Sequence, residues 1–202
     1  MTHSSAPPHV GRATMADIFG EDDLETVPPD VAAGIPHAAT RTFLVEVGLP
    51  DQADTQGWFH RVLDLSEEVG DRGPDQWISL GEIPYDCVDV DASTGVVHAT
   101  PADGGEPYPL NSGLGAFAYL LCVAEAELPF YSGTAEQTLA DGTVRAQVEA
   151  RLERLYGMPR EQMGPTPEAR LRAAIERVDP LALARPDSTW QMVLRYVTEG
   201  MD

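Results

Sequence analysis

Three aspartates at positions 86, 89 and 91 form the densest group of side chains in this chain that could do chemistry. The stretch from Asp89 to Gly95 is superficially similar to a calcium-binding loop, because carboxylate oxygens are ligands that calcium prefers. An EF-hand loop needs glycine at its sixth position and glutamate at its twelfth, where this chain has Thr94 and Thr100. Asp89 and Asp91 stand two residues apart, so in a β-strand they would share one face. We therefore predict a solvated, negatively charged hairpin face, whose functional use would be a patch for a basic partner.

The other residue types used in catalysis and metal binding form no recognised motif. The histidines occur in no H-x-x-H or H-E-x-x-H pattern, and the chain has no G-x-S-x-G, Walker A or G-x-G-x-x-G sequence. These histidines are His3, His9, His37, His60 and His98. Cys87 and Cys122 form no C-x-x-C pair; we predict two reduced, buried thiols, and one disulfide between them stays compatible with the sequence. We therefore predict no catalytic residue, no cofactor and no metal site.

The charge of the chain is strongly negative and unevenly distributed. Its 33 acidic residues outnumber 13 arginines, and with no lysine the formal net charge is −20 at pH 7. Residues 1–110 contain 20 of the acids and only 4 of the arginines. Such a field repels nucleic acid and anionic membranes, and it attracts basic protein surfaces. A second interpretation also stays open, in which the charge only keeps a protein of an acidic, lysine-poor proteome in solution.

The elements that must position these residues can be predicted from periodicity. Residues 37–47 carry apolar side chains on one helical face, and Gly48 and Pro50 follow where a helix should end. The β-branched run TFLVEV at 42–47 also permits a strand. Short β-branched and aromatic runs predict strands at 58–65, 76–83, 85–91 and 95–100. The turn sequence ASTG joins the last two runs, so Cys87–Val97 should form an antiparallel hairpin. The stretch PADGGEPYP at 101–109 should form a loop. A helix should follow Asn111 or Ser112, either of which could cap it.

The last third of the chain has the helical period, with stripes at 144–155, 171–178 and 190–197. Thr166-Pro167 should open the second of these helices, and a capping box from Ser188 to Gln191 should open the third. The first residues contain no apolar stretch typical of a secretory signal, which predicts a cytoplasmic protein. We expect a disordered tail at 1–14 and a single α+β domain at 15–202, with an antiparallel sheet flanked by helices.

A series of short motifs, in a fixed order along the chain, carries a family resemblance. They are Phe19-Gly20, Thr40-Arg41, Phe43-Leu44, Gly48-Leu49-Pro50, Leu80-Gly81, the hairpin around Val88-Asp89-Val90-Asp91 and Gly95-Val96-Val97, Leu110-Asn111-Ser112-Gly113-Leu114 with Phe117, Asp179-Pro180 and Trp190. In that order and spacing the chain resembles the SUKH immunity-protein superfamily, in particular its fourth subfamily from actinobacterial polymorphic-toxin loci. The resemblance implies an α+β fold and a cytoplasmic, non-catalytic protein that neutralises a cognate toxin, often a nuclease or a nucleic-acid deaminase.

The resemblance does not assign partner-contacting positions, so candidates come from charge and expected exposure. We predict a toxin domain with a basic surface as the partner, and neither nucleic acid nor membrane. The candidate acids and aromatic anchors are Glu21, Asp22, Asp23, Asp86, Asp89, Asp91, Trp58, Trp77 and Tyr85. For the loop acids the plain alternative is a solvated loop, and for the aromatic residues it is the core. The alternative function is a non-catalytic scaffold or regulatory interaction module on the same fold.

Overall fold

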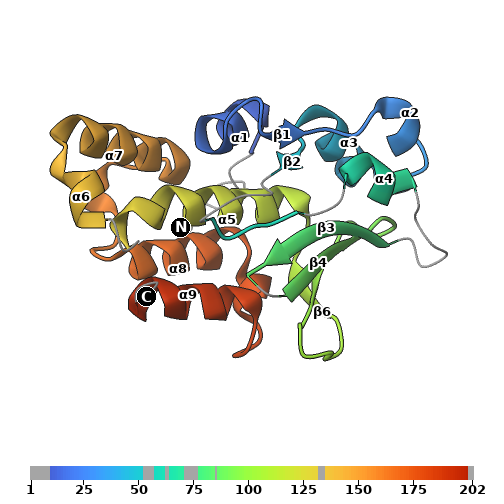
Figure 1. Cartoon of the computed structure of the whole chain (residues 1–202). Coiled ribbons are helices and arrows are strands. Elements are labelled where there is room, and N and C mark those ends of the chain that lie inside the picture. Colours follow the sequence, from blue (N-terminus) through green and yellow to red (C-terminus); the bar gives the residue numbers. More distant parts are fainter. Residues whose placement is uncertain are drawn as a thin grey trace, which may run out of the picture.

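A four-stranded antiparallel sheet forms one side of the molecule, and helices with a small two-stranded sheet form the rest (Figure 1). The computed structural model describes residues 10–51, 57–61, 64–70, 77–84, 86–131 and 135–199. The strands of the sheet, in spatial order, are β3 (Trp77–Ile83), β4 (Asp86–Asp91), β5 (Val97–Thr100) and β6 (Tyr108–Asn111). Each strand pairs with its neighbour in sequence, so hairpin-like connections build the whole sheet.

The two faces of this sheet differ sharply in burial. Ile78, Leu80, Val88, Val90 and Val97 are at most 1% exposed and belong to the hydrophobic core. The residues that alternate with them are polar and half-buried or exposed. This one-sided alternation is typical of an antiparallel sheet that packs on the core with one face and meets water with the other.

The core is centred on α5 (Leu114–Glu127), a helix that is apolar around most of its circumference. A helix of this kind must be surrounded by protein, because no side of it can face water without cost. Figure 1 shows α5 between helices above and below it, and its neighbours include α1 (Arg12–Phe19), α7 (Gly142–Tyr156) and α8 (Pro167–Val178). None of the helices in the described ranges is long and apolar enough to span a bilayer.

The segment before the sheet is built from short elements that cover one side of α5. They are α1, β1 (Leu24–Glu25), α2 (Pro29–Ala32), α3 (Ala38–Glu46), β2 (Leu49–Pro50) and α4 (Leu65–Gly70). The ring of His37 caps α3 by accepting from the Thr40 amide. Gly48 ends the region of α3 at a φ of 81°, and a Cβ there would collide with the Glu25 carbonyl, so glycine is required.

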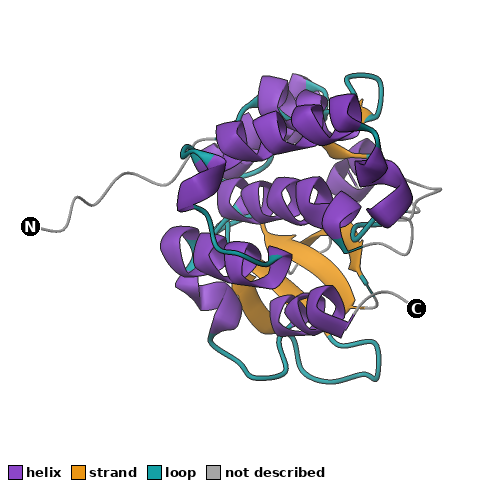
Figure 2. Cartoon of the chain, turned by 90° about the vertical axis from the view of Figure 1, so that its left-hand side faces the viewer, coloured by secondary structure: helices purple, strands orange, loops and turns teal. Residues whose placement is uncertain are grey.

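The C-terminal third is helical, as predicted. In Figure 2, which shows the left-hand side of Figure 1, helices lie in front of the sheet. Its elements are η1 (Leu128–Phe130), α6 (Ala135–Ala140), α7, η2 (Arg160–Gln162), α8, η3 (Pro180–Leu183) and α9 (Thr189–Glu199). Thr166 caps α8 by accepting from Ala169, with proline at the first turn. Ser188 accepts from the amide of Gln191 at the start of α9, which is the serine half of the predicted capping box.

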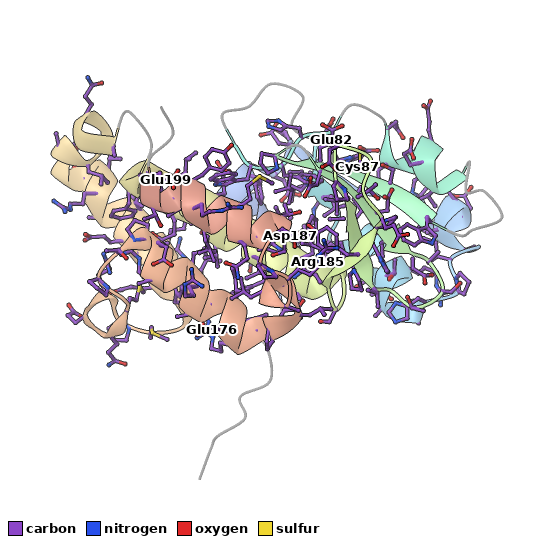
Figure 3. All side chains as sticks on the ribbon, turned by 90° about the horizontal axis from the view of Figure 1, so that it is seen from below. Glu82, Cys87, Glu176, Arg185, Asp187 and Glu199 are labelled. Carbon is purple, nitrogen blue, oxygen red and sulfur yellow. The ribbon has the colours of Figure 1, made fainter. Side chains whose placement is uncertain are left out.

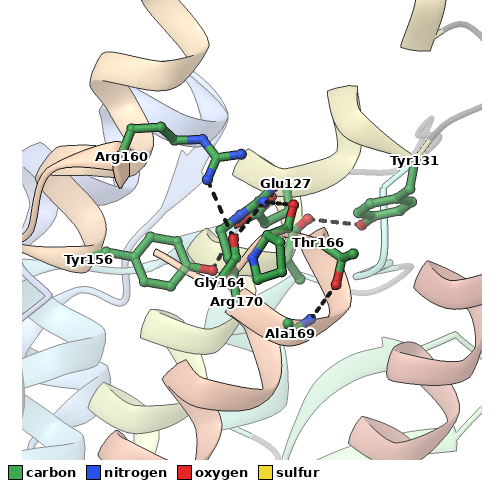
Figure 4. A network of polar contacts seen from close by, with 10 residues as sticks. Glu127, Tyr131, Tyr156, Arg160, Gly164, Thr166, Ala169 and Arg170 are labelled. Carbon is green, nitrogen blue, oxygen red and sulfur yellow. Dashed lines mark hydrogen bonds and ion pairs between the residues drawn. The ribbon is translucent and has the colours of Figure 1, made fainter. Parts of the chain in front are cut away.

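A buried ion pair ties this helical third to α5 (Figure 4). Two nitrogens of the Arg170 guanidinium donate to the Glu127 carboxylate, with a distance of 2.7 Å from Nε to Oε1. Both side chains are at most 1% exposed. The Tyr156 hydroxyl donates to the same carboxylate at 3.0 Å, and the Phe130 ring lies 5.2 Å from the guanidinium carbon. A buried charge pair is tolerated only when its remaining donors and acceptors are satisfied in this way.

The structure confirms the α+β class, the helix at 37–47 and the 87–97 hairpin, and it corrects four local predictions. The run 58–65 contributes one isolated bridge, from His60 to Glu82, and its last residue begins α4. The loop predicted after residue 100 ends in strand β6. Gly113 takes the N-cap position of α5 and no side chain caps that helix. The expected tail boundary at 14 is too late, because Val10 is buried and α1 starts at Arg12.

Candidate functional site

The solvated face of the four-stranded sheet gathers most of the polar side chains that sequence reasoning singled out. We call this surface the outer face. It comprises Trp77, Ser79, Glu82, Cys87, Asp89, Asp91, His98 and Thr100. The four strands contain no arginine, so the charge that they present is negative.

A β-bulge in β3 brings a further carboxylate to the outer face. The register of β3 on β4 shifts between Ser79 and Gly81, so that Ser79 pairs with Asp89 but Glu82 pairs with Cys87. One extra residue reverses the alternation of the strand beyond it, and Glu82 therefore points to the same side as Ser79. Figure 3 shows Glu82 and Cys87 next to each other at one end of the sheet.

Gly81 permits this bulge because its φ is 141°, a conformation that L side chains rarely adopt. A Cβ at this position would also collide with the carbonyl of His60, which crosses the strand to form its bridge with Glu82. Substitution of Gly81 would therefore disturb both the bulge and the segment before α4.

Asp89 is the carboxylate on the outer face with the most unfavourable surroundings. It is half-buried, and within the described ranges its side chain makes no hydrogen bond or ion pair. Burial raises its pKa, and the nearby charge of Glu68 from α4 raises it further. The side chains of Glu68 and Glu82 likewise find no partner among the described residues. Three carboxylates thus lie near one another at α4, β3 and β4, and Arg61, which lines the same hollow as Glu68 and Glu82, is paired with Glu25.

Asp91 differs from Asp89 because its carboxylate holds the turn of the hairpin. It accepts from the amides of Ser93 and Thr94 at 2.7 and 3.3 Å, and from the Thr94 hydroxyl at 2.8 Å. Burial alone would raise the pKa of Asp91, but these hydrogen bonds hold it below its usual value. Asp91 is therefore a turn-forming residue whose negative charge also faces the solvent.

Trp77 supplies an aromatic surface beside these acids. Its ring lies 4.5 Å from the ring of His98, centroid to centroid, at an interplanar angle of 44°. Burial lowers the pKa of His98 more than the charge of Asp91 raises it. A neutral His98 at pH 7 packs against Trp77 without neutralising the acids around it.

The Cys87 thiol is exposed on the outer face, so the prediction of two buried thiols is wrong for this residue. Partial burial raises its pKa, and the charges of Glu82, Asp89 and Asp86 raise it further. A high pKa leaves little thiolate at pH 7, and only the thiolate is a good nucleophile. No group of three histidine, cysteine, aspartate or glutamate residues in the described part of the chain is placed to hold a metal ion.

Two hollows were considered as sites for a ligand. A small one of about 110 Å³ lies between α4 and β3 and opens on the outer face. Its polar wall residues are His60, Arg61, Glu68, Ser79, Glu82 and Cys87. A larger one of about 700 Å³ lies between α3 and the start of α5. Its walls are mostly small or apolar, and its ionisable members are His37, which already caps α3, and Glu46. The outer face is the better candidate because it combines charge with an aromatic ring.

Comparison with models of protein families identifies the family of this chain. The model of the SUKH-4 immunity protein family matches residues 10–196, nearly the whole chain. The chain belongs to the SUKH-4 family. Searches of curated proteins and of solved structures found no match to it.

The structure separates the candidate residues of this SUKH-4 protein into distinct groups. Asp89, Asp91 and Trp77 lie together on the outer face, where Trp77 is the register partner of Asp91. Glu21, Asp22 and Asp23 are exposed in the connection between α1 and β1, which is a separate element of the fold. Of these, Glu21 is paired with Arg12 at 2.7 Å. Tyr85 lies outside the described residues.

Two candidates are corrected because the SUKH-4 fold buries them. Asp86 is 7% exposed and points to the inner face, where it accepts from the Thr189 hydroxyl at 2.7 Å. Trp58 is 3% exposed and donates to the Tyr131 hydroxyl, so it is a core residue and not a surface anchor. Asp86 stands an odd number of residues from Asp89, which by strand alternation already places it on the opposite face.

Sequence reasoning also missed members of the site in the SUKH-4 protein. His98 could have been found, because strand alternation in the second arm of the hairpin places it opposite Asp89. Glu82 needed knowledge of the bulge, for which a glycine inside a strand is the usual signal. Glu68 reaches the site from α4 by tertiary packing, and no local pattern predicts that.

Proposed function

We propose that this protein is an immunity protein that binds a cognate toxin and neutralises it by non-catalytic protein–protein interaction. The observation that carries the proposal is the match of the SUKH-4 immunity protein model to residues 10–196. We further propose that the toxin has a basic surface, as expected of a nuclease or nucleic-acid deaminase that must bind a polyanion. The cytoplasm is the proposed location, since neutralisation must occur where such a toxin would act.

The charge of the molecule supports a basic partner. The outer face and its rim present Glu68, Glu82, Asp89 and Asp91, and the chain as a whole carries a net charge of −20. Complementary fields mainly accelerate association, while buried anchors at the centre of an interface supply much of the affinity. Trp77 is the aromatic residue on the outer face that is placed to act as such an anchor.

The test is co-expression with the toxin domain encoded next to this gene. Wild-type protein should restore growth of cells that express the toxin and should co-purify with it in a fixed ratio. A catalytically inactive toxin variant serves as the binding partner for purification, so that toxicity does not limit yield. Folded, well-expressed protein that neither restores growth nor co-purifies with the toxin would contradict the proposal.

A further inference from the structure

We propose that the outer face docks an arginine side chain of the partner, with its guanidinium stacked on Trp77 and paired with Asp89. The inference rests on the proposed function for the existence of a protein partner, and it adds the place and the chemistry of the contact. Three features of the face support this contact: its openness to solvent, its negative charge and its aromatic ring.

The outer face is free to receive a partner. Its side chains alternate with the core residues of the same strands and remain half-buried or exposed, with Glu82 and Cys87 in the exposed class. The inner face of the sheet is occupied by the core, and Asp86 on that side is tied to α9 through Thr189. A partner would therefore meet the sheet on the outer face, where Glu68, Glu82 and Asp89 form no ion pair with a described residue and where Arg61, in the wall of the small hollow, is paired with Glu25.

The ring of Trp77 is placed to bind a cation from a partner. Trp58 and Trp190 are 3% and 0% exposed, so Trp77 is the described tryptophan whose ring reaches the surface. His98 packs against one side of this ring and fixes its orientation. A cation over the face of a tryptophan is attracted by the ring quadrupole, most strongly where water is partly excluded.

The spacing suits a side chain that offers both a flat surface and hydrogen-bond donors. Trp77 is the register partner of Asp91. Asp89 lies on the same face of β4, two residues from Asp91 and about 7 Å from it by strand geometry. A guanidinium is planar, weakly hydrated and able to pair with a carboxylate through two parallel hydrogen bonds. A lysine ammonium is a compact, strongly hydrated charge that would use the acids but gain less from the ring.

The first experiment measures binding of polyarginine and of polylysine peptides of equal length to the full chain. Quenching of tryptophan fluorescence by acrylamide reports on Trp77, because the other two tryptophans are buried. Polyarginine should protect Trp77 from acrylamide and bind about threefold to tenfold more tightly than polylysine. In Trp77→Phe the protection signal should vanish, and in Trp77→Ala the preference for arginine should disappear.

A matched comparison separates a defined site from general attraction. Asp89→Asn removes one charge from the outer face and should weaken polyarginine binding about threefold to tenfold. The double variant Asp22→Asn, Asp23→Asn removes two charges from the α1–β1 connection and should weaken it less. Equal affinity for both peptides, or a larger loss in the double variant, would overturn the inference.

The same variants distinguish failure of the inference from failure of the proposed function. Trp77→Ala and Asp89→Asn should lower both the affinity for the neighbouring toxin domain and the growth protection that wild type gives. If both variants bind and protect as well as wild type, the docking site is wrong while the immunity function stands. If wild type itself does not protect, the immunity function falls, and the peptide experiment alone decides whether the outer face recognises arginine.

Discussion

Asp86 and Asp89 stand three residues apart in β4 and point to opposite faces of the sheet, which makes them a matched pair for mutation. Asp86 lies in a buried network: its Oδ2 accepts from the Thr189 hydroxyl at 2.7 Å and from the Tyr108 hydroxyl at 3.4 Å. Tyr108 in turn accepts from the Thr189 amide at 2.8 Å, so the network joins β4, β6 and the start of α9. Asp89 has no comparable partners in the described ranges.

The two alanine variants should therefore differ in stability. Asp86→Ala removes a charge-assisted hydrogen bond. The Tyr108 and Thr189 hydroxyls still contact each other at 2.9 Å, but one of their two protons loses its acceptor, so the change should cost about 2–3 kcal/mol. For a domain of this size the melting temperature should fall by about 4–12 °C. Asp89→Ala removes a carboxylate that burial and Glu68 disfavour, so it should leave the melting temperature within about 2 °C of wild type. The change in β propensity from aspartate to alanine is common to both variants and so does not separate them.

The contribution of Asp89 to folding stability depends on pH, and its direction follows from the raised pKa. Burial raises the folded-state pKa of Asp89 above 3.8, so the folded protein binds its proton more readily than the unfolded chain does. The stability that this protonation contributes is present below the unfolded pKa and is lost as pH rises through the folded pKa. The free energy of unfolding of Asp89→Ala, relative to that of wild type, should therefore be highest at pH 7 and should decrease as the pH is lowered toward 4.

Thermal melts of both variants and wild type, followed by circular dichroism at pH 7 and at pH 4–5, provide the measurement. An Asp89→Ala variant that melts as low as Asp86→Ala would refute the reasoning, because it would make Asp89 a structural residue. It would also remove Asp89 from the proposed contact with a partner.

Four further outcomes can be checked on the same protein. Trp190→Ala should cost about 3–5 kcal/mol in a urea titration, since the ring is fully buried; an unchanged midpoint would mean that α9 is an appendage. Arg170→Met should cost about 3–5 kcal/mol, because it leaves Glu127 charged and unpaired in the core, and a neutral effect would show that the pair is dispensable. Cys87 should react slowly with a thiol reagent at pH 7 and Cys122 not at all in the native state, whereas fast, stoichiometric labelling of Cys87 would indicate an activated nucleophile. Association with the toxin should slow as salt is raised to a Debye length of about 8 Å, and a rate indifferent to salt would refute electrostatic steering.

The parts of the fold that sequence predicted well are those fixed by neighbouring residues. The helix before Gly48, the hairpin around ASTG and the proline-led start of α8 each depend on a local pattern of turn, cap and period. Such signals keep their meaning in the folded protein because the hydrogen bonds that satisfy them are local. The α+β class follows from the order in which these elements occur.

The predictions that were wrong concern elements that depend on contacts between distant segments. The run 58–65 has strand composition, but it meets β3 at the single bridge of His60 and Glu82, and its end is recruited into α4. Strand β6 is short and contains Pro109, so its sequence predicts a loop. It forms a strand because it pairs with β5, and that pairing cannot be seen in the local sequence. Strand composition is a statement about packing on neighbours, so it misleads where those neighbours are missing or unknown.

For the candidate site, sequence could find the strand that carries the acids but not the surface that they share. Alternation correctly grouped Asp89 with Asp91, and it could also have excluded Asp86. The burial of Trp58 and the approach of Glu68 both depend on where other elements pack. Burial of individual aromatic residues and convergence of separate elements are tertiary facts with no local signature.

The contrast between the two faces of β4 bears on what the acids are for. Acids that serve the fold here have hydrogen-bond partners: Asp86 has Thr189, Glu127 has Arg170, and Asp91 has its own turn. Asp89 and Glu68 have none in the described ranges, and the charge of Glu68 raises the cost of charging Asp89. A fold gains nothing from such an arrangement, whereas a binding surface does, because an incoming cation relieves the repulsion on contact. The carboxylates that are poorly placed for stability are therefore the ones to test first for recognition of the toxin.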